Sequence, residues 1–135
     1  FNIEIKLPSN AYSLFSLSYL GDAIFELWCR QKILCKLQNS NRVHLLVVKC
    51  VNCRTQAGIS NLLIPLLNNE EKKIYRRGRN SKTKSKPRNS TIKDYRDATA
   101  FECLVGYWFL NNGTGRFEEL MSHSKIVNYL QQNFD

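Results

Sequence analysis

The stretch YSLFSLSYLGDAIFELWCRQKILCK, residues 12–36, decides the fold class. Its apolar residues recur at intervals of three and four, which is the spacing of one face of an α-helix. They are Leu14, Leu17, Tyr19, Leu20, Ile24, Leu27 and Trp28. The stretch therefore predicts a long helix whose apolar face packs on other helices.

Four further helical regions are expected, each bounded by residues that favour caps or turns. They are 42–67 after Asn39-Ser40-Asn41 with Pro65 near its end, 70–77 after Asn68-Asn69 with Gly78 as its stop, 91–110 after Ser90 or Thr91, and 116–134 as one or two helices. Strand-like alternation is missing, so we predict an all-α fold. We expect one domain over 1–135: first helices in 11–78, a basic loop in 79–90, and the remaining helices in 91–135.

The positive charge is concentrated in one segment. Residues 72–97 hold eleven basic and two acidic residues, which equals the whole net charge of +9. A basic segment on an otherwise neutral chain indicates a polyanionic partner, above all nucleic acid. A solvated charged loop is the alternative. For the two acids, Asp94 and Asp97, helix capping and dipole roles are a sufficient explanation.

Five cysteines, an odd number mostly set in apolar segments, predict buried and reduced thiols in a cytosol-like compartment. Cys50 and Cys53 have zinc-like spacing but lack a second ligand pair. No apolar run approaches the ~20 residues that span a bilayer, and the first residues do not look like a signal peptide. We expect a cytoplasmic protein without membrane contact, or one of an organelle stroma or matrix.

Two acids lie inside apolar helical segments. Asp22 stands in YLGDAI (19–24) and Glu102 in AFECLVG (100–106). Carboxylates rarely occupy such surroundings without a partner or a metal ion, and hard divalent cations prefer oxygen ligands. An exposed stripe on each helix, or an ion pair with an arginine, is the alternative.

Three motifs resemble one family. LSYLGDAIFEL (17–27) resembles the signature segment of ribonuclease III, and TAFECLVGY (99–107) resembles the second acidic helix of that family. RRGRN (76–80) and PRNST (87–91), followed by Tyr95-Arg96, are closer still to its Mini-ribonuclease III subfamily. The resemblance extends over about residues 12–120.

The resemblance implies an all-α ribonuclease III-type endonuclease domain that works as a homodimer on double-stranded RNA. It implies Asp22 and Glu102 as catalytic residues and metal ligands, Mg²⁺ as the cofactor with Mn²⁺ as a substitute, and products with 5′-phosphates. Tyr19 aligns with an aromatic residue that packs across the family's dimer; an ordinary core tyrosine is the alternative. Precursor ribosomal RNA of the large subunit (23S-type) is the implied substrate, and a ribosomal protein helper is a further implied partner.

The family site has two more acids, at the positions of Ser18 and Thr99 in this chain. Both hydroxyls should face the site and could bind water around a metal ion without adding charge, so we expect weaker metal affinity. Glu26 lies one turn after Asp22 and either assists the site through contacts with the metal ligands or forms a surface ion pair. Because two acids are replaced, a catalytically inactive RNA-binding or ribosome-associated protein on the same fold stays open, beside an unrelated basic helical adaptor.

RNA contacts are expected from the basic segment. The residues are Arg76, Arg77, Arg79, Asn80, Lys82, Lys84, Lys86 and Arg88. At this length we expect no separate double-stranded RNA-binding domain, so affinity must come from the catalytic dimer and this segment. Such binding is directed mainly at phosphates and 2′-hydroxyls, and it depends steeply on salt.

Overall fold

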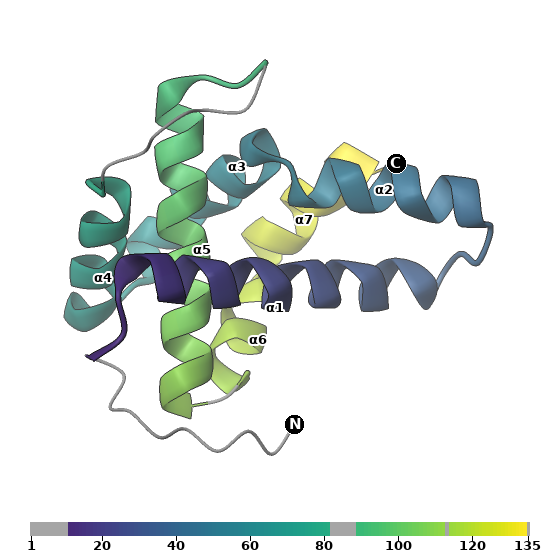
Figure 1. The fold of residues 1–135 in the computed structure, drawn as a ribbon. Helices are drawn as coiled ribbons and strands as arrows, with labels where there is room; N and C mark the ends of the chain where they lie inside the picture. Colours follow the sequence, from purple (N-terminus) through teal and green to yellow (C-terminus); the bar gives the residue numbers. More distant parts are fainter. Residues whose placement is uncertain (1–10, 82–88, 113, 135) are drawn as a thin grey trace.

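Every regular element of the protein is helical in the parts that the computed structural model describes, residues 11–81, 89–112 and 114–134 (Figure 1). The all-α prediction is therefore confirmed. The elements are α1 Leu14–Leu34, α2 Ser40–Val51, α3 Cys53–Leu63, the 3₁₀ turn η2 Ile64–Leu66, α4 Asn69–Arg79, α5 Ile92–Asn112, α6 Gly115–Met121 and α7 Ser124–Phe134. None of these helices is long and apolar enough to cross a membrane.

Helix α5 is the centre of the arrangement. It packs against α1, α3 and α4, and Figure 1 shows α1 crossing it on one side. Phe25 of α1 and Phe101 of α5 meet edge to face in the core, with ring centroids 4.9 Å apart. Trp108 of α5 is also buried. This packing places the two motif helices, α1 and α5, in direct contact.

Local side chains explain where several helices begin. Asn68 and Glu71 form a complete capping box at the start of α4, in which each side chain binds the other residue's backbone N–H. At α5, Thr91 Oγ1 accepts a hydrogen bond from Asp94 N at 3.0 Å. Both helix starts agree with the prediction, because capping depends on residues only three positions apart.

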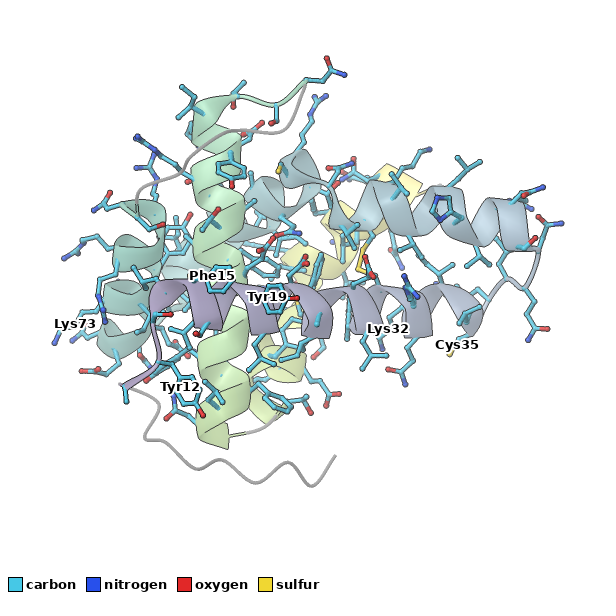
Figure 2. All side chains as sticks on the ribbon, viewed as in Figure 1. Tyr12, Phe15, Tyr19, Lys32, Cys35 and Lys73 are labelled. Atoms are coloured by element: carbon cyan, nitrogen blue, oxygen red, sulfur yellow. A yellow bond between two sulfur atoms is a disulfide. The ribbon has the colours of Figure 1, made fainter. Side chains whose placement is uncertain are left out.

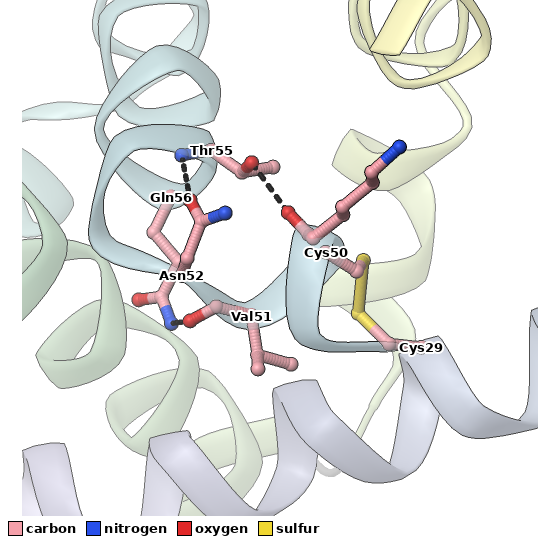
Figure 3. The surroundings of a disulfide bond; sticks show 7 residues. Cys29, Cys50, Val51, Asn52, Thr55 and Gln56 are labelled. Carbon is pink, nitrogen blue, oxygen red and sulfur yellow. Dashed lines mark hydrogen bonds between the residues drawn. A yellow bond between two sulfur atoms is a disulfide. The ribbon is translucent and has the colours of Figure 1, made fainter. Parts of the chain in front are cut away.

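The single helix predicted over 42–67 is wrong, because the chain breaks at Asn52. This residue is extended (ψ 161°), and its side chain accepts from Thr55 N at 2.8 Å, so it caps α3. Thr55 Oγ1 also donates to Lys49 O across the break (Figure 3). One helical stretch therefore becomes α2 and α3, which lets α3 turn towards α5.

The prediction that Gly78 ends α4 is wrong. The helix continues to Arg79 and is capped at Asn80. A Cβ atom at Gly78 would lie 3.0 Å from the Cα of Ala100 on α5. The glycine therefore serves the close approach of α4 to α5, not a left-handed turn.

Cys29 and Cys50 are buried and joined by a disulfide, with their Cα atoms 6.5 Å apart (Figure 3). The expectation that all five cysteines are reduced is wrong for this pair. Helix α2 folds back along α1 (Figure 1), which brings together two residues 21 positions apart in sequence. Cys35, Cys53 and Cys103 are free.

Candidate functional site

The crossing of α1 and α5 is made possible by two glycines. A Cβ atom at Gly21 would overlap the backbone carbonyl of Glu102, and one at Gly106 would overlap the carbonyl of Leu17. The two helices therefore touch backbone to backbone. Because Asp22 follows Gly21 directly, it stands beside Glu102 at this crossing.

The two acids are electrostatically unequal. Asp22 lies at the exposed side of α1, and partial burial together with the charge of Glu26 raises the pKa of its carboxyl. Glu102 is more enclosed, and burial followed by repulsion from Asp22 raises its pKa to about 8. Asp22 therefore ionises first, and its charge opposes the ionisation of Glu102. A bound cation would favour the ionised form of both carboxyls and offset the repulsion between them.

Ser18 and Thr99 lie one turn from the two acids on their helices. Ser18 Oγ donates to Phe15 O at 3.1 Å, and Thr99 Oγ1 donates to Tyr95 O at 2.9 Å. Each hydroxyl proton is thus used within its own helix, and each oxygen keeps a lone pair. Neither residue adds charge to the site.

Glu26 forms the surface ion pair that was one of its two expected roles. Its carboxylate accepts from Arg30 Nη2 at 2.9 Å, one helical turn further along α1. Its charge also contributes to the raised pKa of Asp22. It therefore lies near the acidic pair while its hydrogen bond goes to another residue.

Gln56 of α3 is a residue of this region that the sequence reasoning missed. Its side chain is buried, and its amide lowers the pKa of the Glu102 carboxyl against the larger effects of burial and Asp22, so the two groups are neighbours. Its Nε2 also donates to Val51 O at 2.9 Å. Three helices, α1, α3 and α5, thus converge on the site.

The basic residues of α4 divide into two groups. Arg76 and Arg77 are exposed, and Asn80 is an exposed cap residue. Arg79 instead turns inward and donates from Nε to Asp97 Oδ1 at 2.9 Å. The other expected RNA contacts lie outside the described residues: Lys82, Lys84, Lys86 and Arg88.

The role expected for Asp97, helix capping or a dipole interaction, does not account for its position. It is buried, and its carboxylate accepts from Arg79, from Lys93 Nζ at 2.7 Å and from the Tyr75 hydroxyl at 3.3 Å. Arg79 ends α4 and Lys93 lies in the first turn of α5. Asp97 therefore ties the end of α4 and the start of α5 to the core, beyond any capping or dipole role.

An aromatic pair lies exposed on α1. The rings of Phe15 and Tyr19 stack with centroids 5.4 Å apart, and the residues are 71 % and 72 % exposed (Figure 2). The alternative that Tyr19 is a core residue is therefore excluded. Asp22 lies three residues after Tyr19, so the aromatic pair and the acid share one side of the helix.

Comparison with known proteins gives the family. The model of the ribonuclease III domain matches residues 16–113, which include both acids and the whole of α2 to α5. The chain belongs to the ribonuclease III family. The Mini-ribonuclease 3 of Clostridium tetani is 37 % identical over 119 residues, covering 87 % of this chain and 78 % of that protein. The Mini-ribonuclease 3 of Thermoanaerobacter sp. (strain X514) is 42 % identical over 122 residues, covering 88 % and 84 %.

A solved structure agrees with this assignment. A crystal structure of a Fusobacterium nucleatum protein superposes with a TM-score of 0.80 at 32 % identity, covering 85 % of this chain and 95 % of that one. This ribonuclease III-family member is thus of the Mini-ribonuclease 3 type, and it is an endoribonuclease. The family is generally dependent on divalent metal ions.

The acidic pair fits such an ion. The two carboxylates are hard oxygen donors, and such oxygens suit Mg²⁺ and Mn²⁺. Within the described residues, no cluster of three or more histidine, cysteine or acidic side chains could hold a metal ion. The charge of the site therefore comes from Asp22 and Glu102.

Proposed function

We propose that this protein is a Mg²⁺-dependent endoribonuclease that cleaves double-stranded RNA, with Asp22 and Glu102 as its catalytic metal ligands. Mn²⁺ is the expected substitute. The observation that carries the proposal is the glycine-mediated crossing of α1 and α5, which puts Asp22 beside Glu102. Such close carboxylates repel each other in the absence of a cation, which is a costly arrangement for a fold to keep without a ligand.

The residues have distinct parts in the reaction. A bound divalent cation lowers the pKa of water and neutralises developing charge at the phosphate. Asp22, the more exposed acid, would be one ligand of the cation. Glu102, with a pKa of about 8, holds a proton at neutral pH in the metal-free protein and must release it to become a ligand. Attack of water on the phosphorus would break its bond to the 3′ oxygen, so the products would carry a 3′-hydroxyl and a 5′-phosphate.

RNA binding rests on the positive surface at the end of α4. Arg76 and Arg77 are exposed there, and Lys82, Lys84, Lys86 and Arg88 follow in the sequence. Contacts of this type are made to phosphates, so changing both arginines to alanine should raise KM and reduce the slope of log KM against log salt by up to about 2. An unchanged salt slope would place the RNA on another surface.

The dimer in this proposal uses the aromatic pair on α1. Two stacked rings exposed to solvent indicate a surface that a partner covers, and their position beside Asp22 puts a second copy next to the acidic site. Tyr19→Asp should give a monomer in sedimentation velocity. Leu45→Asp, at another exposed apolar residue, on α2, is the matched control. A Tyr19 variant that still sediments as a dimer would contradict this interface.

The proposed substrate is precursor ribosomal RNA of the large subunit, implied by the resemblance to Mini-ribonuclease III. A ribosomal protein is the helper to add when that RNA is cut slowly on its own. The proposed location is the compartment in which such precursors mature, the cytoplasm or an organelle stroma or matrix. If the protein cuts duplexes in a library of structured RNAs with no preference for the ribosomal precursor, this substrate proposal is contradicted.

The deciding experiment compares cleavage of one sequence as duplex RNA, single-stranded RNA and duplex DNA, with and without Mg²⁺. Of these three substrates, wild type should cut only the RNA duplex, and only when Mg²⁺ is present. Asp22→Asn and Glu102→Gln should each lower kcat more than about a hundredfold, the scale expected when a group acting on the transition state is lost. Glu70→Gln, at an exposed acid of α4, should cut normally.

Two results would contradict the proposal. If the wild-type protein binds the RNA duplex and slows it in a gel without cutting it, the alternative of an inactive RNA-binding protein is supported. An Asp22 or Glu102 variant with normal kcat would show that the catalytic residues lie elsewhere.

A further inference from the structure

Gln56 has one polar atom that the fold leaves unsatisfied. The residue is 2 % exposed, and its Nε2 donates to Val51 O at 2.9 Å (Figure 3). Its Oε1 has no hydrogen-bond partner, and it is the one buried side-chain nitrogen or oxygen in the described residues of which this is true. A buried acceptor without a partner costs about 1–3 kcal/mol, so its presence requires a reason.

The orientation of the amide is determined by its neighbours. Turning it over would place Oε1 against the carbonyl oxygen of Val51, and two acceptors repel each other. Figure 3 shows the nitrogen directed at Val51 and the oxygen directed away from it. The amide lies close enough to the carboxyl of Glu102 to lower its pKa, and Oε1 is bonded to the same carbon as the nitrogen, so this oxygen is a neighbour of the acidic pair.

Packing leaves Gln56 little freedom to leave this position. It lies on the buried side of α3, between Thr55 and Ala57, which are buried as well. Helix α3 packs against α5, which carries Glu102. The position is therefore built into the core, and the oxygen is held there before any ligand arrives.

We propose that Gln56 Oε1 is a third protein ligand of the divalent cation held by Asp22 and Glu102. The inference rests on the proposed metal-dependent function. A carbonyl oxygen is a hard, neutral donor that suits Mg²⁺ and Mn²⁺, and it adds no charge to a pair of carboxylates that already repel each other. One ligand then comes from each of α1, α3 and α5, and the unsatisfied acceptor finds its partner in the cation.

The test measures Mn²⁺ affinity directly, from the electron paramagnetic resonance signal of free Mn²⁺ at pH 8.5 without RNA. Gln56→Met keeps the length of the side chain but removes the oxygen, and it should weaken Mn²⁺ binding by about tenfold or more. Gln56→Glu keeps an oxygen at the same position and adds a charge, so it should bind Mn²⁺ at least as tightly as wild type. Gln31→Met, at an exposed position of α1, is the control for the substitution itself.

The pair of variants separates a ligand role from a structural one. If Gln56 matters only as a hydrogen-bond donor, both variants lose that donor and both should weaken binding, which would overturn the inference. Wild-type affinity in Gln56→Met would overturn it as well. Circular dichroism of each variant gives the folded fraction by which the affinities are normalised.

If the proposed metal-dependent function itself is wrong, the Mn²⁺ affinities will show a different pattern. Glu102→Gln serves as the reference variant and should bind Mn²⁺ much more weakly than wild type. If wild type binds no Mn²⁺, or Glu102→Gln binds it normally, the acidic pair is not a metal site and both proposals fall. If Glu102→Gln loses affinity while Gln56→Met keeps it, only the role of Gln56 is wrong.

Discussion

Replacing Glu102 with glutamine should make the metal-free protein less sensitive to alkaline pH. Burial, and then the charge of Asp22, raise the pKa of Glu102 from 4.5 to about 8 in the folded state. A group whose pKa is raised by folding stabilises the fold fully below its unfolded pKa and loses that contribution as pH rises through the folded value. Wild type should therefore lose stability between about pH 4.5 and pH 8, and the variant should lack this loss.

The size of the effect follows from the two pKa values. The difference of about 3.5 pH units, at about 1.36 kcal/mol for each unit, gives a maximum of about 5 kcal/mol above pH 8. At pH 7, the same reasoning gives about 3 kcal/mol. Relative to its value at pH 4.5, the free energy of unfolding of Glu102→Gln should rise above that of wild type by about 3 kcal/mol at pH 7 and about 4 kcal/mol at pH 8.5.

The assay is urea unfolding in the presence of EDTA at pH 4.5, 7 and 8.5, fitted by linear extrapolation. Asp22→Asn should lower the pKa of Glu102 and so reduce the pH dependence, while Glu70→Gln, at an exposed acid, should follow wild type. Added Mn²⁺ should reverse the order of stability at pH 8.5, because it binds the ionised wild type. If the difference between wild type and Glu102→Gln is the same at all three pH values, the environment assigned to Glu102 is wrong.

Three further changes test the packing. In urea unfolding, Gly21→Ala should lower the free energy of unfolding by about 1–3 kcal/mol or more, because its methyl group meets the backbone of α5. Its control is Gly115→Ala, which has open space around it and should change the free energy of unfolding by less than about 1 kcal/mol. Reducing the bond between Cys29 and Cys50 should cost about 3 kcal/mol for a loop of this length, and a thiol titration of unfolded protein should find more free thiols after reduction than before. Asp97→Asn should cost about 1–3 kcal/mol in the same assay, and equal stability would mean that its ion pairs contribute nothing.

The helix starts were predictable because their causes are local. A capping box such as that of Asn68 and Glu71 needs side chains three residues apart, and both are visible in the sequence. The break at Asn52 depends on a side chain of the same kind, but it lies inside an apolar pattern that continues on both sides. An asparagine costs little inside a helix, so periodicity alone does not reveal that this one ends α2 and starts α3.

Other features depend on contacts between distant segments, which a single sequence does not display. Gly78 follows the local rule for a helix stop, but its cause is the backbone of Ala100 on another helix. The burial of Asp97 becomes evident only when α4 and α5 are packed, since Arg79 lies 18 residues before it. The pairing of Cys29 with Cys50 likewise follows from the folding of α2 along α1.

The acidic pair and Gln56 show why one part of the site was predicted and another was missed. Asp22 and Glu102 are charged residues in apolar segments, a combination costly enough to attract notice even before a family resemblance is considered. Gln56 is neutral, and a glutamine is an ordinary helix residue. Its signal lies in its periodicity: it shares the buried side of α3 with Ile59 and Leu63, at spacings of three and seven. An amide on an apolar helix face must find partners for both its nitrogen and its oxygen, and the described residues supply none for the oxygen, which is why we propose a cation as its partner.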